Sequence, residues 1–359
     1  MRRGPDFDNL RRTLLREGPP GPVPLIELFA DPGMVQAVLS EPLSWASVIQ
    51  GSGLDTLVRF CLEAGYDYVW SWTGLNFPRA NFQVAADTAG AENWSGGARI
   101  WQDESTGPIQ SLADFEAYPW PKPDHISYRA LEYLASAVPE GMKISVNVGG
   151  IFENASWLMG LERFSYALFD QPDLISALFQ RVGDLTATAV SNALSIDGTG
   201  MCFLGDDLGY ASGTVVSPEV LREHVFPQYR RLTQIAHRAG KPILLHSCGN
   251  LERVMDEIAG LGFAAKHSFE DKIMPVEEVH RRWGDRVAVL GGVDMDLLTR
   301  GSEREVRRRA RQILEVCAAR GTGYCLGTGN SAANYLPVEN YLAMLDEGRR
   351  WNREHFSGA

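Results

Sequence analysis

A histidine and a cysteine stand one residue apart where a short apolar strand should end. Residues 242–250 read Pro-Ile-Leu-Leu-His-Ser-Cys-Gly-Asn, so His246 and Cys248 follow four residues typical of a buried strand. Alternate residues of a strand project to the same face, which lets both side chains reach one ion. Imidazole nitrogen and thiolate sulfur are ligands that zinc prefers. The pair therefore predicts part of a zinc site.

A third ligand could come from Cys325, which lies at the end of another expected strand. Two thiolates and one imidazole form a ligand set associated with catalytic zinc and an open fourth position. A thiol that binds zinc loses its proton, so this set favours transfer of a group to sulfur over hydrolysis. The alternative is that the cysteines are small apolar fillers of a core and that His246 is a hydrogen-bonded histidine near a pocket.

Other polar side chains also fall at expected strand ends. Asp206 and Asp207 could hold a metal, act as a general base or cap the following loop. His267 could position a substrate, transfer a proton or satisfy a buried backbone group. Further polar residues at such ends are Glu27, Asn147 and Asp294. Because strand ends converge on one face of a barrel, this density of polar groups indicates an enzyme.

The elements that must position these residues alternate regularly. Stretches with strand character begin near residues 23, 66, 143, 201, 242, 263, 286 and 323, and helical periodicity follows nearly all of them. This alternation predicts an α/β fold, a (β/α)₈ TIM barrel. A doubly wound sheet is the alternative, but no G-x-G-x-x-G pattern follows the first strand.

The domain organisation follows from breaks in this rhythm. We expect residues 1–22 to be an N-terminal extension and linker, and residues 23–359 to be a single barrel domain. Residues 73–123 are rich in Gly, Asn and Pro and contain Trp94 and Trp101. They predict an insertion after the early strands, either a hairpin that covers a pocket or an ordinary surface loop.

Composition and charge restrict the class of protein. The chain has 359 residues, a formal net charge of −11 and 45% hydrophobic residues, which is typical of a globular enzyme and unlike a general nucleic-acid binder. No apolar signal segment follows Met1 and no apolar run is long enough to span a bilayer. Five widely spaced cysteines favour a reducing compartment. We therefore expect a cytoplasmic protein without nucleic-acid or membrane partners.

Several motifs resemble the uroporphyrinogen decarboxylase superfamily, in its branch of cobalamin-dependent methyltransferases. The matching stretches are Asp206-Asp-Leu-Gly, Ser217-Pro-Glu, His246-Ser-Cys-Gly-Asn250, Gly291-Gly-Val-Asp294 and Gly323-Tyr-Cys325 through Pro337-Val-Glu-Asn340. Segments at Trp101-Gln-Asp-Glu and Tyr118-Pro-Trp-Pro121 are similar to that branch as well. The resemblance extends from about residue 50 to the end, and it implies a (β/α)₈ barrel.

The resemblance also implies a function. In the methylcobalamin:coenzyme M methyltransferases of this superfamily, the H-x-C…C pattern carries zinc, which implies His246, Cys248 and Cys325 as ligands here. The expected reaction moves a methyl group between a corrinoid, either methylcobalamin or a corrinoid protein, and a thiol or methylated small molecule. The fourth zinc position would go to substrate, water or a carboxylate such as Asp206 or Glu153. A homodimer is expected because relatives are often dimers.

One departure from the family argues against porphyrin as substrate. Uroporphyrinogen decarboxylases carry an R-Q-A-G-R-type segment after the first strand, whereas residues 25–31 here read Leu-Ile-Glu-Leu-Phe-Ala-Asp, without arginine. A tetrapyrrole with several carboxylates would need such cations.

Two other functional classes stay open. One is a metal-free decarboxylase or lyase that acts on a small carboxylic acid through Asp206 and Asp207. The other is a non-catalytic corrinoid- or metal-binding protein.

Overall fold

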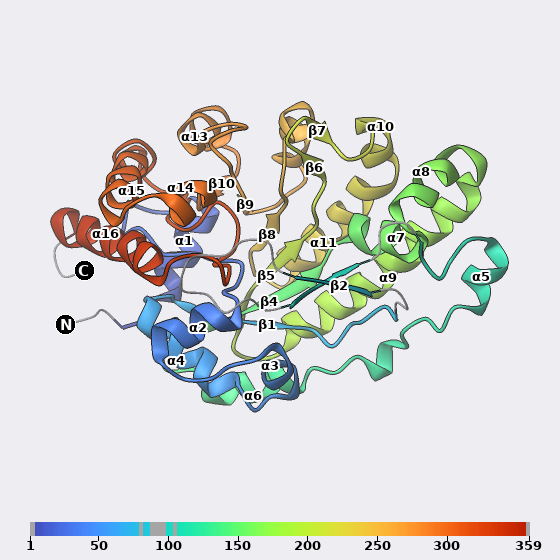
Figure 1. Ribbon diagram of the computed structural model, residues 1–359, viewed down its shortest axis with the longest axis horizontal. Helices are drawn as coiled ribbons and strands as arrows, with labels where there is room; N and C mark the ends of the chain where they lie inside the picture. The colour runs from blue at the N-terminus through green and yellow to red at the C-terminus, as the bar shows by residue number, and fades with distance from the viewer. Residues whose placement is uncertain (1–3, 79–81, 87–97, 103–105, 357–359) are drawn as a thin grey trace.

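Seven parallel strands form one curled sheet at the centre of the molecule (Figure 1). The computed structural model describes residues 4–78, 82–86, 98–102 and 106–356. Along the sheet the strands are β1 (Tyr68–Trp72), β4 (Lys143–Gly149), β5 (Thr199–Gly205), β8 (Ile243–His246), β9 (Ala265–His267), β10 (Ala288–Leu290) and β11 (Tyr324–Cys325). Spatial order follows chain order, which is the topology of a (β/α)₈ barrel.

The eighth barrel position is filled by the segment around Leu25, which makes isolated bridges rather than a regular strand. Leu25 pairs in parallel with Leu326, and the Leu326 N–H donates to the carbonyl of Pro24 at 2.9 Å. On the other side, the hydroxyl of Tyr68 accepts from the N–H of Glu27 and donates to its carbonyl. A side chain thus links this segment to β1. The predicted barrel is confirmed, with an irregular first strand that contains a proline.

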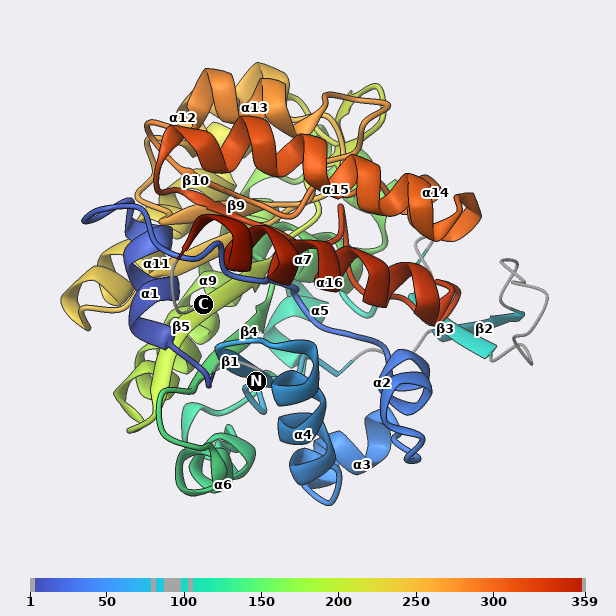
Figure 2. The same cartoon turned by 90° about the vertical axis from the view of Figure 1, so that its left-hand side faces the viewer.

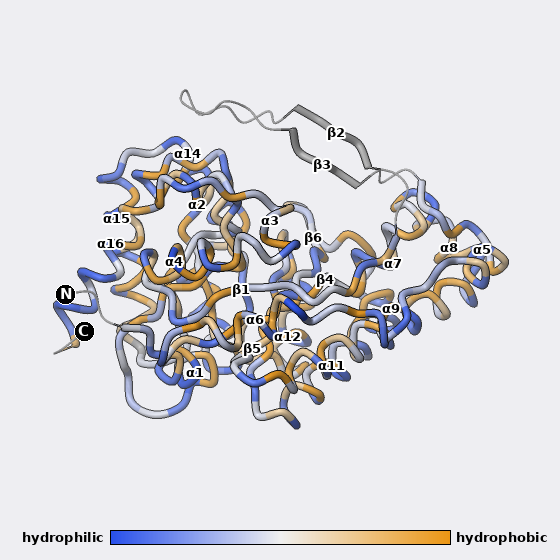
Figure 3. Tube along the Cα trace, turned by 90° about the horizontal axis from the view of Figure 1, so that it is seen from below, coloured by the Kyte–Doolittle hydropathy of each residue, from blue (hydrophilic) through white to orange (hydrophobic). Residues whose placement is uncertain are grey.

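Helices connect the strands and lie outside the sheet (Figures 1 and 2). They are α1 (Phe7–Leu15), α2 (Pro32–Leu39), α3 (Trp45–Gln50), α4 (Leu54–Ala64), α5 (Leu112–Ala117), α6 (Arg129–Ala137), α7 (Ile151–Met159), α8 (Leu161–Asp170), α9 (Pro172–Ser195), α10 (Pro218–Val220), α11 (Phe226–Arg238), α12 (Met255–Ile258), α13 (Val276–Trp283), α14 (Met295–Arg300), α15 (Glu303–Cys317) and α16 (Val338–His355). Apolar and polar segments alternate along α9 and α11 (Figure 3), as expected of helices with one buried face. None of the described helices has the length and apolar content needed to cross a bilayer.

Apolar spacing in the sequence predicts single helices over residues 155–169, 217–239 and 251–261, and the structure differs from all three in detail. The helix expected over 155–169 is divided into α7 and α8 at Gly160, whose φ of 81° and ψ of 135° no helix can continue. The helix expected over 217–239 contains a π turn at Leu221–Val225. The helix expected over 251–261 shortens to a 3₁₀ turn, Glu252–Val254, followed by α12. Short 3₁₀ turns also occur at Pro123–His125 and Ala318–Arg320.

The N-terminal segment is packed against the barrel. Phe7, at the start of α1, is buried, and its N–H donates to the carbonyl of Gly141 at 2.9 Å. The guanidinium of Arg16 donates to the carbonyl of Ala264 at 3.0 Å. Gly141 lies two residues before β4 and Ala264 directly precedes β9. Helix α1 therefore covers the amino-terminal end of the barrel. In Figure 2, α1 lies on the side opposite α2 and α14.

The insertion contains a hairpin, one of the two alternatives that the sequence left open. β2 (Phe82–Ala86) pairs antiparallel with β3 (Ala98–Gln102), with Val84 opposite Ile100. The segment between the two strands, including Trp94, and the side chain of Trp101 lie outside the described residues. That the insertion covers a pocket therefore stays a prediction. A second small hairpin joins β6 (Gly209–Tyr210) to β7 (Gly213–Thr214).

Candidate metal centre

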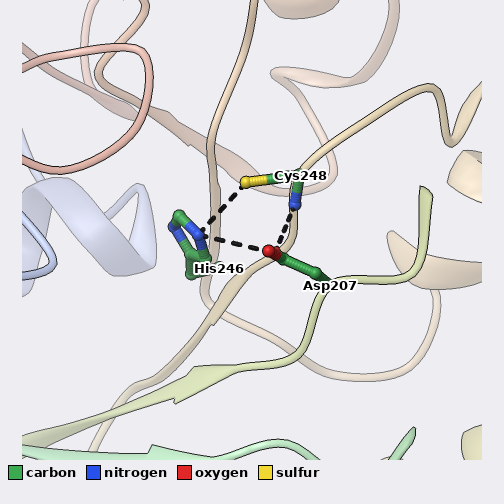
Figure 4. A group of neighbouring side chains, drawn as sticks. All are labelled: Asp207, His246 and Cys248. Atoms are coloured by element: carbon green, nitrogen blue, oxygen red, sulfur yellow. Dashed lines mark hydrogen bonds and ion pairs between the residues drawn. The ribbon is translucent and has the colours of Figure 1, made fainter. Parts of the chain in front are cut away.

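Three potential ligand atoms meet at the carboxyl ends of β5 and β8 (Figure 4). They belong to Asp207, His246 and Cys248, and all lie within 4.8 Å of one another. Nε2 of His246 is 3.5 Å from Sγ of Cys248 and 3.6 Å from Oδ1 of Asp207. The backbone N–H of Cys248 donates to the same Oδ1 at 2.8 Å. We call these three residues the metal group.

The register between two neighbouring strands builds this group. β5 and β8 run parallel with Gly205 beside His246, so the residues that follow the two strands emerge side by side. The turn after Cys248 depends on Gly249, which has a φ of +83°. A Cβ there would lie 2.1 Å from the backbone of Gly209, so no other residue allows the two loops to approach so closely.

A chain of hydrogen bonds fixes the tautomer of His246. Nε2 of His267 is 3.2 Å from the carbonyl oxygen of Thr328, which can only accept, so this nitrogen carries the proton. In a neutral ring, Nδ1 of His267 is then an acceptor, and it lies 2.9 Å from Nδ1 of His246. His246 must donate its Nδ1–H there. Its Nε2 therefore directs a lone pair toward Asp207 and Cys248.

The metal group has the electrostatics of a cation site. Burial lowers the pKa of His246 to about 3 and lowers the pKa of His267 well below its usual value, so both rings are neutral at pH 7. A neutral imidazole lone pair, a carboxylate oxygen and a sulfur thus face one another, and no proton lies between the imidazole and the carboxylate. Zinc uses all three ligand types.

The sulfur of Cys248 is prepared for negative charge. It accepts hydrogen bonds from Oγ of Ser268 at 3.4 Å and from Nδ2 of Asn330 at 3.1 Å. Burial raises the pKa of the Cys248 thiol to about 12, and the nearby carboxylate of Asp207 raises it further. A bound cation has the opposite effect, because a coordinated thiol is deprotonated.

The structure does not bring Cys325 to this group. Leu290 pairs with both His267 and Cys325, so the two lie in one register row. Strands of an eight-stranded barrel tilt, and such a row shifts along the barrel axis by about one residue per strand. Cys325 is three strands from β8 and is fully buried. The pKa of its thiol is raised chiefly by burial and also by the charge of Asp67, a residue that precedes β1. Thr328 is the residue of this segment that contacts His267.

Asp206 acts as the cap of α7. Its carboxylate accepts the backbone N–H groups of residues 151–153 at 2.8–2.9 Å and the hydroxyl of Tyr229 at 2.7 Å. The side chain is fully buried, and burial raises its pKa to about 6. Of the roles considered for Asp206, this geometry matches capping. The carboxylate of Glu153 is likewise outside the metal group.

The polar strand-end residues have distinct partners. The buried carboxylate of Glu27 accepts the N–H of Thr328 at 2.8 Å and its hydroxyl at 2.7 Å. Asn147 donates to the carbonyl of Leu28, and Asp294 caps α14. Sequence reasoning missed Ser268, Asn330 and Thr328. Nothing in their types marked them, although all three follow expected strands.

The fold agrees with the comparisons with known proteins. The family model of uroporphyrinogen decarboxylase (URO-D) matches residues 102–351. The chain belongs to the uroporphyrinogen decarboxylase family, as the motifs predicted.

Among curated proteins, the chain is 28% identical over 195 residues to a methylated-thiol–coenzyme M methyltransferase of Methanosarcina mazei, which covers 54% of this chain and 49% of the relative. It is 26% identical over 220 residues to the methylcobamide:CoM methyltransferase MtaA of Methanosarcina barkeri, which covers 60% of each. The matched regions thus span 49% and 60% of the length of these relatives. A solved structure described as a methyltransferase from Methanosarcina mazei superposes with a TM-score of 0.68 at 16% identity, covering 96% of this chain and 98% of the other, which shows the shared fold.

Proposed function

We propose that this protein is a zinc-dependent methyltransferase that moves a methyl group between a corrinoid and a small-molecule substrate. The observation that carries the proposal is the metal group, in which Nε2 of His246 directs a lone pair toward Asp207 and Cys248. The names of the curated relatives support methyl transfer, and the methylcobamide in one of those names supports the corrinoid. A separate corrinoid protein as carrier, a homodimer and a cytoplasmic location remain predictions.

Each residue of the site has a role that follows from its contacts. Asp207, His246 and Cys248 would hold the metal, with one negative charge each from the carboxylate and the thiolate to balance Zn²⁺. His267 holds His246 in the tautomer that binds metal. Ser268 and Asn330 donate to the sulfur. A zinc ion there would supply Lewis acidity toward the heteroatom that carries or receives the methyl group.

The ligand set bears on the substrate. The predicted set of two thiolates and one imidazole favours a thiol acceptor, whereas the observed group replaces one thiolate by the carboxylate of Asp207. Carboxylates suit harder metal chemistry than thiolates do. The proposal therefore includes both a thiol acceptor and a methylated donor that presents oxygen or sulfur to the metal.

No contact among the described residues favours the alternative of a metal-free decarboxylase. It would use Asp206 and Asp207 as an acid–base pair, but four donors surround the carboxylate of Asp206. Asp207 in turn accepts from the backbone of Cys248. Of the two, only Asp207 is partly exposed, with 45% of its side chain accessible.

Absorbance of cobalamin tests the proposal. Purified protein is mixed with methylcobalamin and a panel of small thiols, and separately with cob(I)alamin and methylated donors. We expect transfer that is lost in His246→Ala, abolished by a chelator and restored by zinc. Cys325→Ala is the matched control and should retain transfer. Methyl transfer that survives both the chelator and Cys248→Ser would contradict a zinc-dependent mechanism.

A further inference from the structure

A small cavity lies behind the loop that carries Cys248, on the outer side of the sheet. Its volume is about 40 Å³, room for about three water molecules. Lys266 of β9 lines it, and because His267 faces the barrel interior, the neighbouring Lys266 must face the opposite way. Most of the other walls are apolar and include Leu251, Met255, Val279 and Trp283.

Lys266 is an unusual residue for such a place. It is only 2% exposed, and its one hydrogen-bond partner among the described residues is the carbonyl of Ser268. Its ammonium nitrogen also lies 4.1 Å from the ring centre of Phe269. An ammonium group has three donors, so two remain for a ligand in the cavity. A buried cation without a carboxylate at ion-pair distance is costly, which favours an anion beside it.

We infer that this Lys266 cavity binds a small organic anion, a carboxylate attached to a short apolar body. The ammonium of Lys266 would hold the anionic head, and the apolar walls would cover the body. Inorganic ions lack such a body. Two carboxylates among the lining residues, Glu252 and Glu270, disfavour ligands with more than one negative charge. Glu252 is already paired with Arg282.

The Lys266 cavity is separate from the metal group but adjoins it. Ser268 donates its hydroxyl to the sulfur of Cys248 and accepts the Lys266 ammonium at its carbonyl. Gly249 and Ser268 both line the cavity. An anion there would lie one residue from a metal ligand, yet its binding requires no metal. The inference is therefore independent of the proposed function.

Isothermal titration calorimetry with the full chain tests this inference. The probes are acetate and propionate, with propylammonium and chloride at equal ionic strength as controls. We expect saturable binding of the two anions, at one per chain, and none of propylammonium. Lys266→Met should weaken anion binding at least tenfold. Lys272→Met, which removes an exposed lysine paired with Asp296, is the matched control and should leave binding unchanged.

A second variant keeps the test decisive if Lys266→Met does not fold. Ile273→Trp enlarges a half-buried lining residue while Lys266 stays intact, and it should also weaken binding. Circular dichroism checks that each variant is folded, and zinc content is measured in parallel to separate the two sites. Absence of saturable binding by the wild type would overturn the inference. Equal affinity of folded Lys266→Met, or of Ile273→Trp, would overturn it too.

Discussion

Three residues from separate segments, Glu27, Thr328 and His267, determine which nitrogen of His246 faces the metal group. The buried carboxyl group of Glu27 accepts hydrogen bonds from both the N–H and the hydroxyl of Thr328. The carbonyl of Thr328 then fixes the tautomer of His267, and His267 fixes that of His246. Residue types predicted His246 and Cys248 correctly as neighbours. They could not predict this chain, because it depends on residues up to 301 positions apart.

Removing the acceptor of His246 should weaken zinc binding. In His267→Ala, Nδ1 of His246 loses its partner, and the ring can rotate or change tautomer. We expect zinc affinity to fall about 10- to 100-fold, the usual effect of losing such a partner. Competition with a chromogenic chelator measures it. His237→Gln, which changes an exposed histidine far from the site, should bind zinc normally, and unchanged affinity in His267→Ala would contradict the chain.

Glu27 should make stability fall with rising pH. Burial raises the pKa of Glu27 to about 8, so the folded state binds a proton that the unfolded state releases above about pH 4.5. The contribution of Glu27 to the free energy of unfolding is fully present below about pH 4.5. Roughly 4 kcal/mol of it is lost as the pH rises to about 8. Glu27→Gln should remove this dependence. Urea denaturation of both proteins at pH 5 and pH 8 tests it, and parallel curves would contradict the prediction.

At the scale of elements, the carboxyl end of β5 contributes to two structures. Asp207 joins the metal group, while its neighbour Asp206 caps α7. The sequence predicted both strands and the loop after them. It could not divide the two aspartates between roles, because the direction of each side chain depends on where α7 begins.

Asp206 should matter for stability rather than chemistry. In Asp206→Asn, the amide nitrogen cannot accept, which leaves a buried backbone N–H without a partner. We expect the free energy of unfolding to fall by about 2–4 kcal/mol, and by about 1 kcal/mol in Tyr229→Phe. Urea denaturation measures both. Loss of methyl transfer at unchanged stability would instead indicate a catalytic Asp206.

The tilt of the barrel strands explains why Cys325, which was predicted as a zinc ligand, lies apart from the metal group. Cys325 ends β11 just as His246 ends β8, and from the sequence alone both strand ends would be placed at the same height along the barrel. Because the strands tilt, residues in one register row shift along the barrel axis by about one residue from each strand to the next. Chain positions alone do not reveal this shift, which places Thr328 rather than Cys325 near His267.

At the scale of the whole molecule, the barrel has a covered end and a mouth that carries the site. The alternation of strands and helices predicted this architecture. Residues 1–22 were expected to be an extension and linker because they are polar and then rich in Pro and Gly. The spacing of Phe7, Leu10 and Leu14 did carry a helical signal, and all three side chains are buried.

The packing of α1 should contribute strongly to stability. Phe7→Ala removes a buried ring from the amino-terminal end of the barrel, and we expect a loss of about 3–5 kcal/mol in the free energy of unfolding. Arg12→Ala, on the exposed side of α1, should change it by less than about 0.5 kcal/mol. Thermal and urea denaturation measure both. Equal stability of the two variants would show that α1 adds little to the folded barrel.

Metal content tests the central claim most directly. Wild-type protein, Cys248→Ala and Cys325→Ala are purified with zinc in the medium and measured by mass spectrometry. The account predicts about one zinc per chain in the wild type and in Cys325→Ala, and none in Cys248→Ala. Loss of zinc in Cys325→Ala would restore Cys325 as a ligand. A wild type without zinc even after reconstitution would contradict a zinc enzyme altogether.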